Sequence, residues 1–354
     1  MLSTFIFDAA QSPGKFGLAA SLWANQQKQP LWSLRPDFNE NFPNAYQHVV
    51  PAGNCVTGGL YRSDTLQHEV SDIAFLPAED ALIVLADADA EKIRHLAGQR
   101  LFSQYDGNTL SLLDSNHSVI WQHTLTASIN SEPTLTVGLV ADEQDQREVY
   151  PATIDALMAA ARCAGISLQI RFFPPASVTN RLHELNQLDG ILLPGGASMP
   201  AVAGQIAVAH HTLQHQIPTL GLCLGMQSMC TAALQLNSGY EQAMLAEVAP
   251  DATVHSFIPF TDRTHRCGLF PFPASAPFHQ MHYNHRYYFN PQYLPQLAAS
   301  GIRINAQTNA IIEGINHPAH PFWQGVQGHP ELMSRPETPH PLFVTFIQTM
   351  LAQG

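Results

Sequence analysis

The stretch GLCLGMQ, residues 221–227, places a cysteine, Cys223, between two glycines, Gly221 and Gly225. The apolar run IPTL precedes it and the helical pattern LGMQSMCTAALQL follows, in the order strand, tight turn, helix. Small residues in such a turn permit a strained backbone that holds the central side chain out at the sheet edge. Most free cysteines are small buried core residues, so a nucleophilic Cys223 needs support from the rest of the chain.

Buried strands alternate with helices on both sides of this turn. We predict strands at 134–142, 167–173, 188–196 and 217–223, and helices at 147–165, 201–216, 224–236 and 341–353. The alternation predicts an α/β fold with a mostly parallel sheet flanked by helices. Sites in such sheets form at the carboxyl ends of strands, so PGG (194–196) and GLC (221–223) are predicted to face one crevice. Residues 237–320 are rich in Pro, His and aromatic residues and predict a meander of antiparallel strands.

Residues 1–130 predict a smaller α/β domain that precedes a domain at 133–354. A strand is predicted at 3–10, a helix at 14–27, and a strand followed by a helix at 80–98. Short alternating strands joined by DGN and DSN turns are predicted over 100–125. The linker is predicted at TASINSEPT, residues 126–134.

A nucleophilic Cys223 would require a base, because a free thiol with a pKa of about 8.5 is only slightly ionised at neutral pH. The N-terminus of the following helix favours a thiolate, and a histidine oriented by a carboxylate would complete the site. The segment QGHPEL offers His329 and Glu331, which alternation places on one face of an extended chain. Cys223, His329 and Glu331 are therefore the predicted catalytic residues. The alternative is a core cysteine and an ordinary turn.

The motifs LLPGG (192–196), GLCLGMQ (221–227) and GHPE (328–331) occur in this order. Together they resemble the class I, or triad, glutamine amidotransferases, and within that class the glutaminase domain of CTP synthase. The resemblance covers residues 133–354 and includes HRYYFN at 285–290. It implies a flavodoxin-like fold and hydrolysis of L-glutamine to glutamate and ammonia through a thioester on Cys223. It implies neither a metal nor another cofactor for this step.

The roles of individual residues follow from the resemblance where the motifs match. His329 would act as base and then as acid, Glu331 would orient it, and the backbone N–H groups of Gly196 and Leu224 would form an oxyanion hole. The residues implied to contact glutamine are Gln227, Glu247 and Arg286. A guanidinium suits the substrate α-carboxylate, and a carboxylate suits its α-ammonium group.

Two positions near the thiol depart from the family pattern. Ala197 and Gly328 stand where CTP synthases have phenylalanine. Loss of two aromatic side chains favours a wider pocket, a looser lid or a larger substrate. A hydrolase of another γ-glutamyl amide is therefore an alternative function.

The first domain resembles the amidoligase domain of CTP synthase only faintly. SPGKFGLAASL (12–22) resembles its phosphate loop and NAYQHVV (44–50) a segment that follows. Gly14 and Lys15 are the candidate phosphate-loop residues, but Phe16 occupies a place that needs a small or hydroxyl residue. The domain is too short to contain the expected acidic metal-binding segments, so ATP and Mg²⁺ binding are not expected. We interpret it as an eroded remnant that no longer makes CTP; an unrelated small α/β domain is the alternative.

Composition limits the possible partners. The net charge of −12 argues against nucleic-acid binding, which needs cations against phosphates. No apolar run approaches the ~20 residues of a membrane span, and no cysteine or histidine spacing suggests a metal site, so a soluble, cytoplasmic protein is predicted. With only 12% charged residues, a homo-oligomer is expected. Ammonia would pass to an acceptor on a separate synthetase or on the N-terminal domain. A catalytically quiet scaffold or regulator is the remaining alternative.

Overall fold

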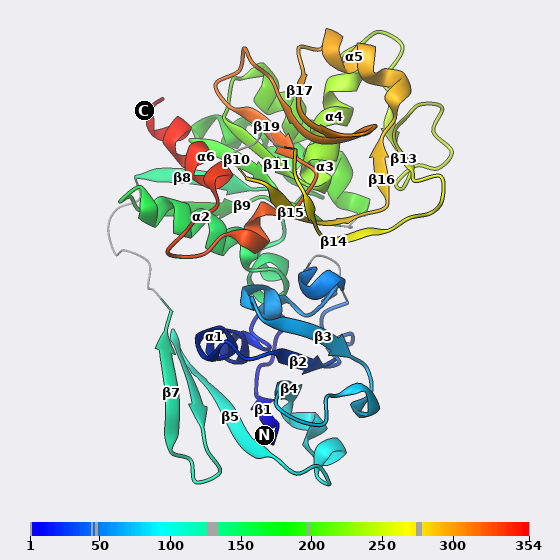
Figure 1. Cartoon of the computed structure of the whole chain (residues 1–354). Helices are drawn as coiled ribbons and strands as arrows, with labels where there is room; N and C mark the ends of the chain where they lie inside the picture. Colours follow the sequence, from blue (N-terminus) through cyan, green and yellow to red (C-terminus); the bar gives the residue numbers. More distant parts are fainter. Residues whose placement is uncertain are drawn as a thin grey trace. The chain divides into compact units, whose positions relative to one another are not determined.

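The computed structural model describes residues 2–43, 45–46, 49–125, 134–196, 199–273 and 278–353. The chain divides into two compact units, residues 1–129 with 144–152 and residues 130–143 with 153–354. Each unit contains a sheet with helices (Figure 1), which confirms the predicted α/β fold with a smaller N-terminal α/β part. The boundaries 1–130 and 133–354 stay a prediction. Residues 144–152 belong to the first unit, and residues 126–133 of the proposed linker lie outside the described residues.

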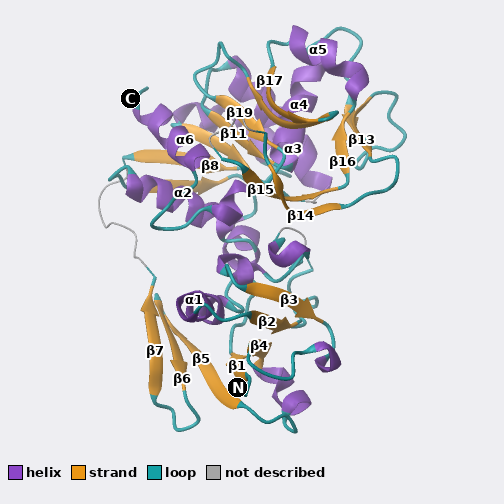
Figure 2. Ribbon diagram, in the orientation of Figure 1, coloured by secondary structure: helices purple, strands orange, loops and turns teal. Residues whose placement is uncertain are grey.

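The main sheet of the second unit has the strand order β17-β18-β19-β11-β10-β8-β9. Its parallel strands are β8 (Leu135–Leu139), β9 (Leu168–Phe172), β10 (Gly190–Leu193), β11 (Thr219–Leu222) and β19 (Trp323–Val326). Antiparallel strands β18 (Ile311–Asn316) and β17 (Arg303–Thr308) extend one edge. The accompanying helices are α2 (Ala152–Cys163), α3 (Met199–Gln214), α4 (Leu224–Gln235) and α6 (Pro341–Leu351) (Figure 2). Among the helices described, none is long and apolar enough to cross a membrane.

The central strands are largely apolar because both faces of the sheet are covered. Ile191 and Leu193 of β10 pack in one buried cluster with residues of α3 and α4. Leu192, between them, packs in a second cluster with residues of α2 and α6. Continuous apolar runs such as GILL are typical of parallel strands buried in this way. Their carboxyl ends then form the edge at which the site lies.

The segment between α4 and β17 forms smaller sheets. Its elements are β12 (Met244–Leu245), β13 (His255–Pro259), β14 (Arg266–Pro271), β15 (Gln280–His285), β16 (Tyr287–Phe289) and α5 (Leu294–Ala299). Strands β14 and β15 form an antiparallel hairpin, and β13 pairs with β16 in the same sense. The predicted antiparallel meander is present, with one parallel pairing between β12 and β13.

The sheet of the first unit has the order β3-β2-β4-β1-β5-β6-β7. Its strands are β1 (Thr4–Asp8), β2 (Leu31–Leu34), β3 (Leu66–Val70), β4 (Leu82–Ala86), β5 (Gln99–Asp106), β6 (Thr109–Leu113) and β7 (Val119–Thr124). Strands β1 to β5 pair in parallel, and β6 and β7 continue the sheet as antiparallel hairpins. One helix, α1 (Leu18–Gln27), follows β1.

Three predicted helices are shorter than their patterns. The helix predicted at 14–27 begins at Leu18, because Gly17 adopts a left-handed conformation with φ of 77° at its N-cap. The helix predicted at 147–165 begins at Ala152, directly after Pro151, and 145–149 form a wider helical turn. After β4, residues Asp87–Ile93 form only a 3-10 helix. Periodicity identified the elements, and the turn residues decided where each begins.

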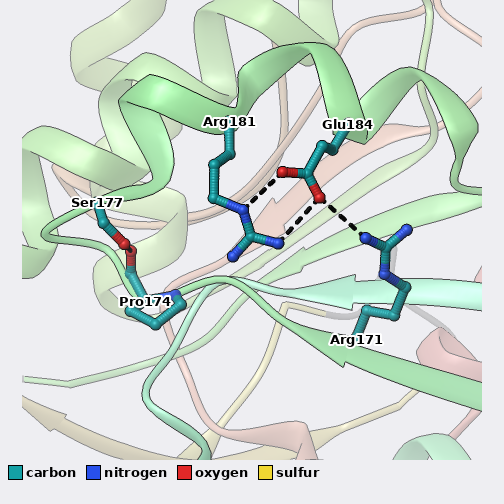
Figure 3. Close-up of polar contacts among 5 residues, drawn as sticks. All are labelled: Arg171, Pro174, Ser177, Arg181 and Glu184. Atoms are coloured by element: carbon teal, nitrogen blue, oxygen red, sulfur yellow. Dashed lines mark hydrogen bonds and ion pairs between the residues drawn. The ribbon is translucent and has the colours of Figure 1, made fainter.

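An ion-pair cluster joins β9 to the 3-10 helix Val178–Gln187 (Figure 3). Glu184 accepts from Arg181 Nε at 2.7 Å and from Arg171 Nη2 at 2.9 Å. Both guanidinium groups also lie over the ring of Phe173, 5.5 and 4.8 Å from its centroid. Ion pairs that face water contribute little stability, so the buried ring is the main anchor of this connection.

Candidate active site

Cys223 lies on the turn between β11 and α4, with φ of 50° and ψ of −106°. This is a strained backbone for a residue other than glycine. A Cβ atom on Gly225 would overlap the carbonyl oxygen of Leu193, and one on Gly221 would lie 2.8 Å from the carbonyl carbon of Gly225. The N–H of Cys223 donates to the carbonyl of Val326 at 2.8 Å. The two glycines are thus required for the turn to fit between its neighbouring strands.

His329 and Glu331 follow β19, the strand beside β11. The Nδ1 atom of His329 lies 2.8 Å from Glu331 Oε1, and both residues are 1% exposed. A Cβ atom added to Gly195, at the end of β10, would lie 2.9 Å from His329 Cε1 and 3.5 Å from the Cβ of Cys223. The ends of three adjacent strands therefore bring Cys223, His329 and Gly195 together.

Electrostatics favour a charged His329. Burial alone would lower its pKa, but the negative charges of Cys223 and Glu331 outweigh burial and raise the pKa to about 10. A protonated imidazole beside a carboxylate can stabilise negative charge that forms on a nearby sulfur, which a histidine-activated cysteine nucleophile needs.

Two glutamines lie behind the thiol. Gln327 is fully buried, and its Nε2 atom lies 3.7 Å from the sulfur of Cys223. Its Oε1 atom accepts from Nε2 of Gln227 at 3.3 Å. Gln227 was predicted to contact the substrate; it is 4% exposed, with its amide directed to Gln327. Gln327 was not predicted, although the alternation that selected His329 and Glu331 also includes it.

The predicted clamp residues lie at the surface, within electrostatic range of one another. Glu247 and Arg286 are exposed. Partial screening of the Glu247 carboxylate from water raises its pKa, and the positive charge of Arg286 acts against that shift. Burial raises the pKa of Tyr287, and the charge of Glu247 adds to the shift. Sequence reasoning did not select Tyr287, the neighbour of Arg286.

A polar chain connects this clamp to the nucleophile. Nη2 of Arg286 lies 3.2 Å from Nδ1 of His265, whose Nε2 lies 2.6 Å from the side-chain oxygen of Asn284. The backbone carbonyl of Asn284 accepts from the Cys223 thiol at 3.9 Å. Asn284, on strand β15, therefore contacts the sulfur of Cys223. Arg286, the residue directly after this strand, is the one predicted to bind the α-carboxylate of the substrate.

The two predicted oxyanion donors occupy suitable backbone positions. Leu224 is the first residue of α4, and the first N–H groups of a helix have no acceptor within it. Gly196 has a φ of 151° and directly follows Gly195. Such a backbone favours glycine and sets the direction of this N–H group.

The structure describes Gly328 but not Ala197, the two positions that depart from the family pattern. Ala197 lies outside the described residues. A side chain on Gly328 would overlap the sulfur of Met281 and lie 2.8 Å from the carbonyl oxygen of His282. Met281, on β15, is fully buried. Its side chain fills the space beside residue 328, so Gly328 leaves no vacancy there.

The candidate phosphate loop, 9–17, turns inward on a carboxylate. Asp8 ends β1 and accepts from the N–H groups of Ala10 at 2.9 Å and Gly17 at 3.0 Å. The hydroxyl of Tyr105 lies 2.9 Å from both Asp8 Oδ2 and the carbonyl of Lys15. Because that hydroxyl has one proton, a protonated Asp8 satisfies all of these groups. Burial raises the pKa of Asp8 to about 6, despite these hydrogen bonds.

Several other amides of this loop also have internal partners. Gly14 donates to the carbonyl of Glu148 at 2.6 Å, Lys15 and Phe16 donate to Ser12, and Leu18 donates to Lys15. A Cβ atom on Gly14 would lie 2.9 Å from the Glu148 carbonyl oxygen, so packing explains this glycine. Lys15 is exposed and Phe16 fully buried. A phosphate loop presents its backbone N–H groups to the ligand, and these are already engaged.

The mostly parallel sheet, the strained cysteine turn and the adjacent histidine–carboxylate pair define an α/β protein with a candidate cysteine nucleophile. The family described as "Glutamine amidotransferase class-I" matches residues 148–349. The chain belongs to this family, as predicted.

Similar proteins support this assignment. The chain is 31% identical over 321 residues to the CTP synthase of Trichormus variabilis, covering 82% of this chain and 57% of the relative. It is 28% identical over 323 residues to that of Acaryochloris marina, with the same coverage. The chain thus spans about half the length of these relatives. A solved structure, the glutaminase domain of Trypanosoma brucei CTPS with bound acivicin, shares the fold. Its TM-score is 0.57 with 21% identity, over 62% of this chain and 94% of that domain.

Proposed function

We propose that the chain hydrolyses L-glutamine to L-glutamate and ammonia through a γ-glutamyl thioester on Cys223. One observation carries the proposal: the strained cysteine turn and the buried His329–Glu331 pair meet against Gly195. This is the arrangement that triad chemistry needs. Family membership supports glutamine as the substrate.

The reaction proceeds in two steps, formation of the thioester and its hydrolysis. The Cys223 thiolate attacks the side-chain amide carbon, and the oxygen becomes an oxyanion that the N–H groups of Gly196 and Leu224 stabilise. His329 gives its proton to the departing nitrogen, the C–N bond breaks and ammonia leaves a thioester. Water then attacks, His329 takes its proton, and the C–S bond breaks to release glutamate. Loss of one oxyanion donor typically costs about 3–4 kcal/mol in the transition state.

The clamp would hold the amino-acid end of the substrate. Arg286 pairs with the α-carboxylate, and Glu247 pairs with the α-ammonium group. Gln227 acts indirectly in this scheme, since its amide holds Gln327 against the sulfur. Because Met281 fills the space beside Gly328, one of the two arguments for a larger amide is weakened.

The fate of the ammonia is a separate part of the proposal. The first unit does not bind nucleotide phosphate, because its loop amides are engaged by Asp8 and by neighbouring carbonyls. Neither ATP, Mg²⁺ nor another cofactor takes part in glutamine hydrolysis. Ammonia passes to a separate synthetase, and CTP is not made by this chain alone. We also propose a cytoplasmic protein and, from its low charge content, a homo-oligomer.

Ammonia release from purified protein tests the proposal, with Cys223→Ala as control. Glutamine should give glutamate and ammonia in equal amounts, and the control should give neither. A glutamine-analogue electrophile should label Cys223. If the protein hydrolyses γ-glutamyl peptides faster than glutamine, its substrate is a larger amide and not glutamine. No release and no labelling would favour a quiet scaffold.

A further inference from the structure

A buried glutamine, Gln205 of α3, joins two elements of the candidate site. Its Nε2 atom donates to the carbonyl of Pro194 at 3.0 Å, and its Oε1 atom accepts from the hydroxyl of Ser228 at 2.9 Å. Gln205 is 1% exposed and Ser228 is fully buried. Pro194 directly follows β10, and Ser228 lies in the second turn of α4. One side chain therefore connects the strand end that leads to Gly195 with the helix that follows Cys223.

The chemistry of the partners fixes the direction of both hydrogen bonds. A peptide carbonyl can only accept, so the Nε2 group of Gln205 must face Pro194, and its Oε1 atom must face Ser228. An amide oxygen also can only accept, so the serine hydroxyl must donate. A buried amide without such partners costs stability. The two contacts therefore hold the side chain of Gln205 in one orientation.

Packing alone would favour an apolar residue at position 205. Val202 and Ile206 of α3 belong to a buried apolar cluster that also includes Met229 and Ala232 of α4. A paired polar group inside such a cluster adds only modest net stability, because folding exchanges its hydrogen bonds to water for those to protein. A glutamine at this position therefore points to a role in placing the two groups that it contacts.

The contact to Pro194 acts on the segment of one proposed oxyanion donor. The peptide group between Pro194 and Gly195 is planar, so a hydrogen bond to its carbonyl also fixes the direction of the Gly195 N–H. Gly195 and Gly196 have no Cβ atom to limit their backbone conformation. The N–H of Gly196 belongs to the next peptide group, so its direction depends on how the preceding one is held.

The contact to Ser228 acts on the other proposed donor. Leu224 is the first residue of α4, and Ser228 lies four residues later on the same face of the helix. Backbone hydrogen bonds make a helical turn a rigid unit, so a contact at Ser228 also restrains the end that carries Leu224. Gln205 reaches both segments from a third element, α3, and thereby sets the distance between them.

We propose that Gln205 is a positioning residue that holds the N–H groups of Gly196 and Leu224 at the separation that an oxyanion needs. The inference rests on the proposed function, because this separation matters only if Cys223 attacks a carbonyl carbon. Such donors stabilise the transition state when they are fixed in advance, to within about 0.5 Å of the productive geometry. Loss of the amide should therefore slow the chemical step and leave substrate binding intact.

Two substitutions test this role. Gln205→Met keeps the length of the side chain and removes both hydrogen bonds. We expect kcat to be at least about tenfold lower and KM to be unchanged, because an oxyanion exists only in the transition state and the intermediate. Ser228→Ala removes only the link to α4, and we expect a kcat between those of Gln205→Met and wild type.

Ser256→Ala is the matched control. The hydroxyl of Ser256 lies 2.7 Å from that of Thr231, which follows Ser228 on α4 by three residues, and both are fully buried. This variant also removes a buried hydrogen bond to α4, so it should lower the thermal midpoint and leave kcat unchanged. If kcat instead follows the thermal midpoint across the three variants, Gln205 only stabilises the fold.

A second pair of readouts does not depend on glutamine. p-Nitrophenyl acetate acylates a thiolate through an oxyanion, with loss of p-nitrophenolate, whereas iodoacetamide alkylates it without one. The rates of both reactions at Cys223 are followed by mass spectrometry of its peptide. Gln205→Met should slow acylation about tenfold and leave alkylation at the wild-type rate.

The same comparison separates the role of Gln205 from the choice of substrate. If glutamine is not hydrolysed but acylation alone is slowed, the substrate is wrong and the role of Gln205 stands. An unchanged acylation rate, equal slowing of both reactions, or no acylation of Cys223 in the wild type would overturn that role.

Discussion

Gln327 is the part of the site that the sequence motifs did not select. It alternates with His329 and Glu331 along one extended segment, so the rule that placed those two on one face applied to it as well. Its amide contacts the sulfur of Cys223 and the amide of Gln227. No periodicity tells which residue of such a run contacts sulfur, because that depends on where β19 ends relative to α4.

Gln327→Glu tests this contact with an isosteric change. The substitution replaces a donor 3.7 Å from the sulfur with a group that is negative when ionised. Like charges at that distance disfavour the thiolate, so we expect alkylation of Cys223 at pH 7 to be at least about tenfold slower. Gln324→Glu, on strand β19 just before Gln327, is the control and should keep the wild-type rate. An equal rate in Gln327→Glu would show that the amide does not act on the thiol.

His329 predicts a pH dependence of defined sign. Its pKa is raised from 6.5 to about 10 in the folded protein. The stabilisation from its charged form is therefore complete below pH 6.5 and is lost as the pH rises through about 10. His329→Gln should remove this dependence. The difference in unfolding free energy between wild type and variant, measured in denaturant from pH 6 to 10, should shrink as the pH rises. A constant difference would contradict a charged His329.

Helix α4 and strand β10 pack against the turn at Cys223 with almost no free space. The N-terminus of α4 lies so close to β10 that a methyl group on Gly225 would overlap the carbonyl of Leu193. The spacing Gly–X–Cys–X–Gly is therefore a packing requirement of strand and helix, and the strained backbone of Cys223 persists because this packing holds it.

Gly225→Ala should damage the second unit. The overlap forces α4 away from β10, and we expect a loss of about 2–4 kcal/mol in unfolding free energy together with loss of ammonia release. Gly239→Ala is the control. Gly239 also has a positive φ, 88°, but no atom lies within 4 Å of its Cβ position, so it should cost only about 1 kcal/mol. Equal effects in the two variants would refute the overlap.

The loop after β1 should respond to pH through Asp8. Its pKa rises from 3.8 to about 6 on folding, so the protonated form stabilises the first unit below pH 3.8, and this contribution is lost as the pH rises through 6. The loss amounts to about 3 kcal/mol. Asp8→Asn should be more stable relative to wild type at pH 8 than at pH 4. Denaturant unfolding followed by tryptophan fluorescence measures this, since Trp23, Trp32 and Trp121 lie in the first unit. A pH-independent difference would exclude a protonated Asp8.

The whole molecule combines a candidate glutaminase site in its second unit with a first unit in which several amides of the loop after β1 bond internally. The chain covers 57% of the length of its CTP synthase relative from Trichormus variabilis. The two units thus raise different questions. The second has the residues on which the proposed ammonia release depends, and the first has an α/β sheet with several loop amides that bond internally.

Calorimetry with Mg-ATP tests the first unit in the full-length chain. We expect no measurable binding and no change in ammonia release when ATP is added. Lys15→Ala should behave as wild type in both assays, because its side chain is exposed and its backbone is held by internal hydrogen bonds. Tight, magnesium-dependent binding that Lys15→Ala abolishes would establish a working phosphate loop.

Local chemistry made most of the fold and the triad predictable. Apolar runs with glycine turns identified the strands, and alternation linked His329 to Glu331. Gly328 shows the limit of this reasoning. Its smallness suggested a wider pocket, but Met281, 47 positions earlier, fills the space. A vacancy depends on every side chain that can reach it, and sequence spacing does not reveal which ones do.

The sequence by itself determined that the protein has an α/β architecture, with a cysteine on a glycine-flanked turn and a histidine–glutamate pair in its second domain. Those features depend on residue type and short-range spacing. Tertiary structure alone decided that Gln327 contacts the sulfur, that Met281 fills the space beside Gly328 and that Asp8 engages the loop amides. Each of these contacts joins residues whose distance in space is set by how strands and helices pack, a relation that no local pattern encodes.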